Sequence, residues 1–388
     1  MVPNWSDYFP VERVATHLGT GFEQSISFKA KKLDPCGLDV QVGELHQTTW
    51  VGSTGSTHGT HVSSTILGYF YRSNFDAAQG FPLPPIVVRG IAPEVTLIPI
   101  KVLADYQLPA LPKCTNPGPI PSQTINFGTW DTVAAGIDYA TNLAIAGYRP
   151  MVINMSLGGG ALDPGLKTAI DRAIANGVIV VAAAGNEGKD GMSYPGAYAP
   201  VISAGAAGWI KEWYKPDNGL PPPRYRLWWL QRDPYGFNDI PESTPADQVY
   251  VTDFSSRELT GQELDVLAPG SWVRGPFAGD PGFNHLPWWS KGIGDLVGGN
   301  AGNFFYVGGT SMATPHVAAV AALMLEKNST LTQVQVESIL KTTALSIPPG
   351  SATVFDLVPE QGFYTYSWEG DATGAGLINA TAALAATP

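Results

Sequence analysis

Continuous apolar runs rich in valine and isoleucine alternate with alanine-rich stretches of helical periodicity from residue 86 onward. Continuous runs are typical of strands buried on both faces, whereas an apolar residue at every third or fourth position indicates a helix. Strands are expected at residues 96–103, 150–155, 178–183, 201–204 and 265–268. Helices are expected at residues 59–69, 130–146, 164–176, 310–327 and 331–342. This alternation predicts a three-layer α/β/α fold with a mainly parallel central sheet.

Four segments interrupt this alternation of predicted strands and helices and are dense in proline, glycine or aromatic residues. We interpret them as insertions into a single domain that spans residues 1–388, at residues 71–90, 105–123, 209–250 and 275–303. The last two contain six of the 11 tryptophans, namely Trp209, Trp213, Trp228, Trp229, Trp288 and Trp289. These side chains either form a satellite core under long loops or line a rim that faces a ligand.

The composition and charge of the chain argue against several classes of protein. With 44% apolar and 14% charged residues the chain is typical of a globular protein, and its net charge of −11 argues against binding to nucleic acid or to an anionic membrane. No apolar run reaches the roughly 18 residues that span a bilayer, and residues 1–7 lack the features of a signal peptide. Cys36 and Cys114 could form one disulfide or remain free thiols.

A serine stands at the start of the most apolar predicted helix. Residues 309–316 read Gly-Thr-Ser-Met-Ala-Thr-Pro-His and lead into a run of nine apolar residues. A bend at Gly308 and Gly309 would expose the hydroxyl of Ser311, and the free N–H groups of the helix N-terminus favour negative charge beside it. The alternative is that Ser311 or Thr310 only caps the helix.

Three more motifs carry polar side chains at the edges of predicted elements. Residues 58–61 read His-Gly-Thr-His, residues 154–158 read Asn-Met-Ser-Leu-Gly, and residues 183–188 read Ala-Ala-Gly-Asn-Glu-Gly. His58 and His61 have the spacing of zinc ligands but lack a third ligand nearby. Asn186 could be a turn residue or a donor to a developing oxyanion.

In this order the four motifs resemble the subtilase family of serine proteases, and the resemblance covers roughly residues 56–382. It implies a subtilisin-like fold in which Ser311 attacks the peptide carbonyl, His58 acts as general base and Asn186 donates to the oxyanion. It also implies that Ser156, Leu157 and Gly158 pair with substrate, that Ala183, Ala184 and Gly185 form a wall of the first specificity pocket, and that Ser193 lies at its base. No charge is visible at that base, so an apolar substrate side chain is expected there.

The family's catalytic aspartate, which ends a buried strand before the histidine, has no match ahead of His58. Either residues 14–21 are that segment and Gly19 replaces the aspartate, or the aspartate and its strand lie upstream of Met1. Residues 11–18 contain several polar side chains and are too polar for a strand buried on both faces, which favours an N-terminally incomplete domain.

Two functions follow from the resemblance. The first is a serine endopeptidase that works through an acyl-enzyme on Ser311, and the second is an impaired or inactive subtilase-fold module that binds peptides. An esterase of the α/β-hydrolase class fits poorly, because its nucleophile requires Gly-x-Ser-x-Gly and residue 313 is alanine.

The resemblance also sets expectations about partners. A protein or peptide substrate is expected and no cofactor is required for the chemistry. Structural calcium is possible, although its ligands stay unknown because the segment 71–90 replaces the loop that would supply them. Secretion, and a missing N-terminal segment or propeptide, are further expectations.

Overall fold

The computed structural model describes residues 1, 4–31, 34–50, 57–71, 86–110, 122–210, 212–214, 225–226, 246–277, 293–294, 304–356 and 362–388. The α-helices are α1 (Thr57–Leu67), α3 (Trp130–Ile145), α4 (Pro164–Ala175), α5 (Thr310–Lys327), α6 (Gln333–Thr343) and α7 (Ala380–Ala386). None of these helices is both long and apolar enough to cross a bilayer.

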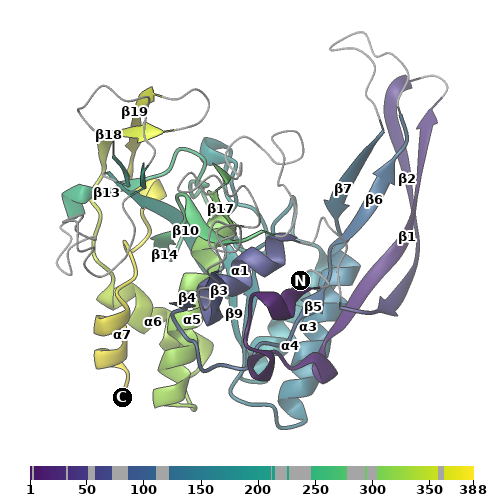
Figure 1. The fold of residues 1–388 in the computed structure, drawn as a ribbon, viewed down its shortest axis with the longest axis horizontal. Helices are drawn as coiled ribbons and strands as arrows, with labels where there is room; N and C mark the ends of the chain where they lie inside the picture. Colours follow the sequence, from purple (N-terminus) through teal and green to yellow (C-terminus); the bar gives the residue numbers. More distant parts are fainter. Residues whose placement is uncertain are drawn as a thin grey trace, which may run out of the picture.

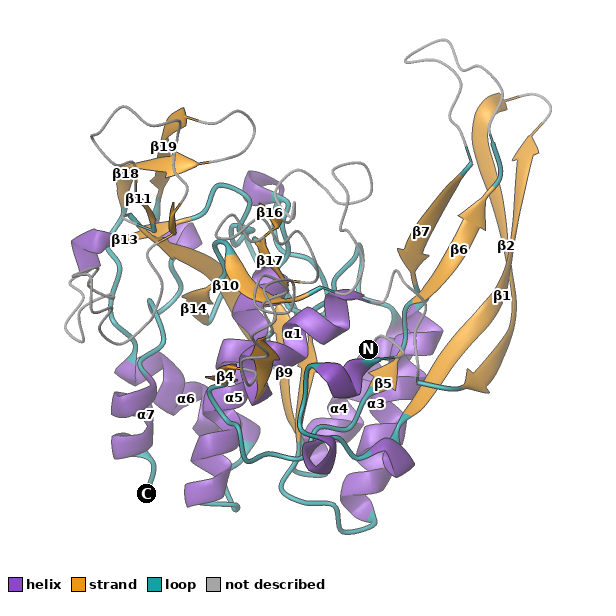
Figure 2. Ribbon diagram, in the orientation of Figure 1, coloured by secondary structure: helices purple, strands orange, loops and turns teal. Residues whose placement is uncertain are grey.

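A mainly parallel sheet forms the centre of the molecule (Figures 1 and 2). Its strands run in the order β13-β10-β9-β8, and β14 also pairs with β10; all pairs are parallel except β10 with β13. Their bounds are β8 (Val152–Met155), β9 (Ile179–Ala183), β10 (Ile202–Trp209), β13 (Val249–Val251) and β14 (Val266–Pro269).

Strand β9 shows how the layers are built. Val178, just before the strand, and its residues Val180 and Ala182 pack against α3 and α4, whereas Ile179 and Val181 pack against α5. Alternate residues of a strand face opposite sides of a sheet, so a continuous apolar run is what a strand covered on both faces requires. The predicted three-layer α/β/α fold is therefore confirmed.

Helix α5 is the central helix of the fold and begins at the predicted serine motif. Its bounds agree with the sequence prediction, and it is apolar on all sides because it packs against the sheet on one face and against α1 and α7 elsewhere. Pro315 lies inside the helix, beyond the first turn, and has no N–H to donate to the carbonyl of Ser311. That carbonyl is consequently available to another partner.

Two antiparallel hairpins project from the body on the same side (Figure 1). One joins β1 (Thr20–Lys31) to β2 (Asp34–Thr48), and the other joins β6 (Ala104–Leu108) to β7 (Gln123–Phe127). The Tyr106 hydroxyl donates to the Gln24 carbonyl at 3.1 Å and its ring packs on Phe28, so the hairpins support each other. The sequence analysis missed the first hairpin, although apolar and polar residues alternate along both of its strands.

The remaining strands form small antiparallel sheets. They are β3 (Gly68–Tyr71) with β4 (Ile86–Arg89), β11 (Trp213–Tyr214) with β12 (Tyr225–Arg226), β15 (Val273–Pro276) and β16 (Ile293–Gly294) with β17 (Phe304–Val307), and β18 (Gly350–Asp356) with β19 (Gly362–Trp368). Trp209, at the end of β10, is buried. Cys114, the Cys36 side chain, Trp228, Trp229, Trp288 and Trp289 lie outside the described residues, as does much of each predicted insertion.

One predicted strand is mostly absent. Residues 96–103 form a single bridge from Leu97 to Val14 and the two-residue strand β5 (Ile100–Lys101), which pairs with the start of β1. A strand needs hydrogen-bonded neighbours, and this segment has them along one edge only within the described residues.

Candidate active site

Ser311 lies in the first turn of α5, at the carboxyl end of the central strands. Its hydroxyl lies 3.3 Å from the Ser156 carbonyl, just beyond β8, and the Ser156 hydroxyl donates to the Ser311 carbonyl at 2.7 Å. The second bond satisfies the carbonyl that Pro315 leaves without an intrahelical donor. Two motifs 155 residues apart in the sequence are thus locked together.

Asn186 is oriented by the residue that precedes Ser311. Its side-chain oxygen accepts from the Thr310 backbone N–H at 2.8 Å and from the Thr310 hydroxyl at 3.0 Å. The Thr310 hydroxyl also bonds to the backbone of Gly185, so the end of β9 and the start of α5 are held together. Because the amide oxygen is occupied, the amide NH₂ group points away from Thr310 and is available to a negatively charged oxygen beside the Ser311 N–H.

Three residues of the predicted specificity pocket, Gly158, Gly185 and Ser193, lie close together. A side chain placed on Gly158 would lie 2.8 Å from the Ser193 Cβ, and one placed on Gly185 would lie 2.8 Å from the Ser193 hydroxyl. Ser193 therefore sits between the two glycine-containing walls, one formed by residues 156–158 and the other by residues 183–185. Both glycines leave room at this base that any other residue would fill.

A carboxylate that the sequence analysis missed reaches the base of this pocket. The Glu187 carboxylate accepts from the Ser193 hydroxyl at 3.0 Å and from the Ser256 hydroxyl at 2.9 Å. The expectation of an uncharged base is therefore wrong. Ser256 comes from a distant segment, so only the tertiary structure could aim this carboxylate.

His58 lies in the first turn of α1 and is partly exposed. Desolvation, together with the positive charge of the Met1 amino group, lowers the pKa of His58 to about 4. The imidazole is thus neutral at neutral pH, as a general base must be. Within the described part of the chain no hydrogen bond joins His58 to Ser311, and such bonds often tighten only when substrate binds.

Among the described residues, neither His58 nor His61 belongs to a group of three side chains that could hold a metal ion. His61 is fully buried, and its Nε2 lies 3.0 Å from the Val273 carbonyl and 3.2 Å from the Phe305 carbonyl. Since carbonyl oxygens accept hydrogen bonds, Nε2 carries the proton and cannot bind a metal at the same time. His61 is thus held by two backbone carbonyls, whereas His58, one turn earlier on the same helix, is partly exposed.

No ion pair joins His58 to a carboxylate among the residues that the structure describes. Gly19, the sequence candidate for a replaced aspartate, follows a short 3-10 helix and does not end a central strand. A side-chain atom added to Gly19 would lie 2.4 Å from the indole ring of Trp50. The position is closely packed and has no room for a carboxylate.

We predict that Gly19→Asp lowers the free energy of unfolding by about 1–3 kcal/mol, because the new side chain must displace the Trp50 ring. Urea unfolding followed by tryptophan fluorescence measures the change. Gly160→Asp is the matched control, since no atom lies within 4 Å of the side-chain position at Gly160. Equal stabilities of the two variants would contradict the close packing at Gly19.

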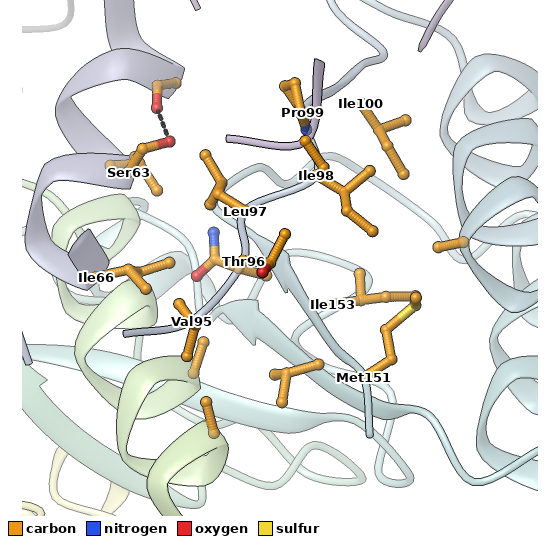
Figure 3. A pocket seen from close by; sticks show the side chains of 18 of the residues that line it. Ser63, Ile66, Val95, Thr96, Leu97, Ile98, Pro99, Ile100, Met151 and Ile153 are labelled. Carbon is orange, nitrogen blue, oxygen red and sulfur yellow. Dashed lines mark hydrogen bonds between the residues drawn. The ribbon is translucent and has the colours of Figure 1, made fainter. Parts of the chain in front are cut away.

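A cavity of about 1000 Å³ begins beside His58 and runs into the body of the molecule. It lies between the segment 95–102 and strand β8, under α1 and α3, and most of its lining is apolar. Figure 3 shows side chains of both segments around the same space, among them Ile98 and Ile100 from the first, and Met151 and Ile153 from the second. His58 and Ser156 both line this cavity, so it is continuous with the candidate active site.

One cluster of carboxylates within the described residues has the spacing of a cation site, Glu263, Asp265 and Glu337. The ammonium group of Lys341 forms ion pairs with all three, at 3.0 Å to Asp265 and 3.4 Å to Glu337. A calcium ion would have to displace this ammonium, so the cluster does not fit a calcium site. Calcium elsewhere in the protein stays a prediction of the sequence.

Comparisons with known proteins show the family of the chain. The profile of the Subtilase family matches residues 44–367. Subtilisin DY of Bacillus licheniformis is 30% identical over 315 residues, which cover 80% of this chain and 77% of that protein. Subtilisin E of Bacillus subtilis (strain 168) is 30% identical over 294 residues, which cover 75% of this chain and 51% of that protein, so the chain matches about half of its length.

Solved structures show a similar fold. Sphericase superposes with a TM-score of 0.52 at 22% identity, covering 95% of this chain and 85% of that one. Fervidolysin from Fervidobacterium pennivorans superposes with a TM-score of 0.52 at 24% identity, covering 88% of this chain and 38% of that one.

Proposed function

Since the chain belongs to the subtilase family of serine proteases, we propose that it is an endopeptidase that hydrolyses peptide bonds through an acyl-enzyme on Ser311. The observation that carries this proposal is the orientation of Asn186 by Thr310. A merely structural asparagine would not need its amide oxygen fixed by both the N–H and the hydroxyl of the residue before the nucleophile.

The proposed reaction uses the side chains of Ser311, His58 and Asn186. The Ser311 hydroxyl attacks the substrate carbonyl and passes its proton to His58, which later gives it to the leaving amine. The amide of Asn186 and the backbone N–H of Ser311 stabilise the oxyanion of the tetrahedral intermediate. Water then releases the acyl group from Ser311 by the same steps in reverse.

Substrate would lie along two walls as an added strand. Residues 156–158 follow β8 and provide a backbone edge, in the way that sheet edges bind extended peptides. Ala183, Ala184 and Gly185 would enclose the side chain on the acyl side of the cut, with Ser193 at its base. Secretion of such a protease stays a prediction.

A fluorophosphonate, which reacts with activated serines, tests the proposal. We expect it to modify Ser311 in the folded chain and not in Ser311→Ala, with the modified residue identified by mass spectrometry. Ser351→Ala, at an exposed serine of β18, is the matched control and should be labelled as the parent is. Failure to label the folded parent on prolonged incubation would overturn the proposal.

A second function, a module that binds peptides without cutting them, is favoured by one observation. Within the described residues no carboxylate is paired with His58, and losing that partner costs about 10,000-fold in rate. Such a module would bind a peptide along residues 156–158 and release it intact. Mass spectrometry of the bound peptide after incubation separates the two functions.

We further predict that Glu187 favours basic side chains in the specificity pocket. The Ser193 and Ser256 hydroxyls hold its carboxylate at the pocket base, where it attracts a lysine or arginine of the substrate. Glu187→Gln should lower the ratio of kcat/KM for lysine over leucine substrates about tenfold, equal to about 1.4 kcal/mol. Glu44→Gln, at an exposed position on β2, should leave the ratio unchanged. An unchanged ratio in Glu187→Gln would show that the carboxylate does not reach the substrate.

A further inference from the structure

His61 is a buried titratable residue to which the proposed reaction gives no role. It lies one turn after His58 on α1, and its side chain is fully buried. The Nε2 atom lies 3.0 Å from the Val273 carbonyl and 3.2 Å from the Phe305 carbonyl. The Nδ1 atom is buried and has no hydrogen-bond partner within the described residues. Among these residues, the ring is therefore held by the proton on Nε2 alone.

The two carbonyls that accept from His61 belong to different strands. Val273 begins β15 and Phe305 lies in β17, and these strands pair with each other in antiparallel fashion. Strand β17 ends at Val307, just before the turn that leads into α5 and Ser311. One imidazole N–H thus joins the helix that carries the proposed base to the strand that leads to the proposed nucleophile.

Apolar side chains surround this hydrogen-bonded contact. Val62 of α1, Phe305 of β17 and Met312 of α5 belong to one buried cluster. The ring of Phe277, in the same cluster, lies 6.1 Å from the ring of His61, measured between centroids. In such a place water does not compete for the hydrogen bond, and a donor that is lost leaves its acceptors at a higher cost than at the surface. The seat of α1 against β17 therefore depends on a donor at residue 61.

The backbone of β15 approaches α1 closely at Gly275. A side-chain atom added to Gly275 would lie 3.1 Å from the Nε2 atom of His61 and closer still to the Ser64 hydroxyl. That hydroxyl donates to the His61 carbonyl at 2.6 Å, so it cannot turn away without losing this bond. Substitution of Gly275 is therefore a second way to move α1, and it leaves the histidine in place.

The position of the His58 ring follows the position of its helix. Within the described part of the chain, His58 has no hydrogen bond to Ser311 and no ion pair with a carboxylate. Proton transfer between two side chains depends steeply on their geometry, and a displacement of about 1 Å can cost about 100-fold in rate. A residue that fixes α1 against β17 can therefore control the reaction without contacting the reacting atoms.

We propose that His61 is a positioning residue, which holds His58 in place relative to Ser311 by joining α1 to β15 and β17 through its Nε2–H. The role requires a hydrogen-bond donor at this position and does not require a group that titrates. His61 transfers no proton itself. The effect of His61 on the reaction rate rests on the proposed function, whereas its effect on the position of α1 does not.

Three variants at this contact test the proposal. His61→Leu removes the donor, His61→Gln keeps one, and Gly275→Ala pushes α1 away from β15. Leu340→Ala is the matched control, because Leu340 is equally buried but belongs to the cluster of the central sheet, α5 and α6. Two quantities are measured under conditions in which circular dichroism shows every variant folded. They are the second-order rate constant of fluorophosphonate labelling of Ser311 and the hydrogen exchange of the α1 amides.

We expect His61→Leu to react about 100-fold more slowly than the parent, and Gly275→Ala at least about tenfold more slowly. His61→Gln should keep at least about a third of the parent rate, since its NH₂ group can donate to the same carbonyls. Leu340→Ala should react as the parent does. With a peptide substrate, the loss in His61→Leu should appear in kcat and not in KM, because the walls that would bind substrate are unchanged. The α1 amides should exchange at least about tenfold faster in His61→Leu and Gly275→Ala than in Leu340→Ala.

Other results would contradict the proposal in different ways. A parent-like labelling rate in His61→Leu would overturn the effect on the reaction. Equal slowing in Leu340→Ala would assign that effect to lost stability, and equal slowing in His61→Gln would show that the donor is not its cause. If the folded parent is not labelled at all, the proposed function fails and hydrogen exchange decides the rest. Faster α1 exchange in His61→Leu with parent-like exchange in His61→Gln would then support the positioning of α1, and unchanged exchange would overturn it.

Discussion

Asn186→Ala is expected to slow the reaction of Ser311 with a fluorophosphonate by about 100- to 1,000-fold. This magnitude is the one measured for the corresponding asparagine of subtilisin and is adopted here as the expectation. The physical reason is that Thr310 occupies the amide oxygen, which leaves the NH₂ group as the donor to the developing negative charge. The second-order rate constant of labelling measures the effect without requiring peptide turnover.

Two further variants make this result specific. Asn186→Asp keeps an oxygen that can accept from Thr310 but replaces the donor with negative charge, so it should be at least as slow as Asn186→Ala. Asn176→Ala removes an asparagine that caps α4 and should react at the parent rate. A normal rate in Asn186→Asp would show that the amide does not act on the oxyanion.

The second large effect is on stability in acid. Desolvation lowers the pKa values of His58, His61 and His316 to about 4 in the folded protein, from an ordinary value of 6.5. The unfolded chain therefore binds more protons than the folded chain between pH 6.5 and about 4, and stability falls as the pH falls through this window. For the fully buried His61 this difference amounts to roughly 3 kcal/mol.

His61→Gln isolates this contribution. Glutamine can still donate to the Val273 and Phe305 carbonyls but does not titrate. Between pH 6.5 and 4 the parent should lose roughly 3 kcal/mol more of its unfolding free energy than the variant does, as measured by urea unfolding at each pH. His46→Gln, at an exposed position, should follow the parent. Parallel curves for the parent and His61→Gln would contradict the prediction.

The acid response also has an opposing component. Burial and the charge of Asp265 raise the pKa of Glu337 to about 7. Glu337 thus binds its proton more tightly in the folded state, and this stabilises the fold as the pH falls below 7. Both proteins contain Glu337, so its contribution cancels when the pH dependence of stability is compared between the parent and His61→Gln. The pH dependence of either protein alone would include it.

Several helices and strands were predictable because the sequence pattern that indicates each one lies within the element itself. Helix α5 begins at the residue that the sequence indicated, since Gly309 is its N-cap and every face of the following run is apolar. Strands β8, β9 and β14 were also found within two residues of their bounds, because burial on both faces leaves a continuous apolar run.

The hairpin of β1 and β2 shows where the sequence interpretation went wrong. Polar and apolar residues alternate along both strands, a pattern typical of strands with one exposed face, yet no strand was predicted there. Residues 96–103 are the opposite case, because a strand was predicted there and is mostly absent. Their apolar run satisfies the requirement for a buried strand, yet only one edge finds a partner within the described residues.

For the site, the sequence by itself determined the kinds of side chain and the elements that carry them: a serine at a helix start, a histidine on another helix and an asparagine after a buried strand. The tertiary structure alone decided the contacts among them. The Ser156 hydroxyl donates to the Ser311 carbonyl, which Pro315 leaves without an intrahelical donor. Thr310 binds the side-chain oxygen of Asn186, and the Glu187 carboxylate accepts from the Ser193 hydroxyl. The tertiary structure also formed the apolar cavity beside β8. Periodicity along a chain reports which face of an element is buried, whereas contacts between groups more than 100 residues apart depend on the path of the chain between them.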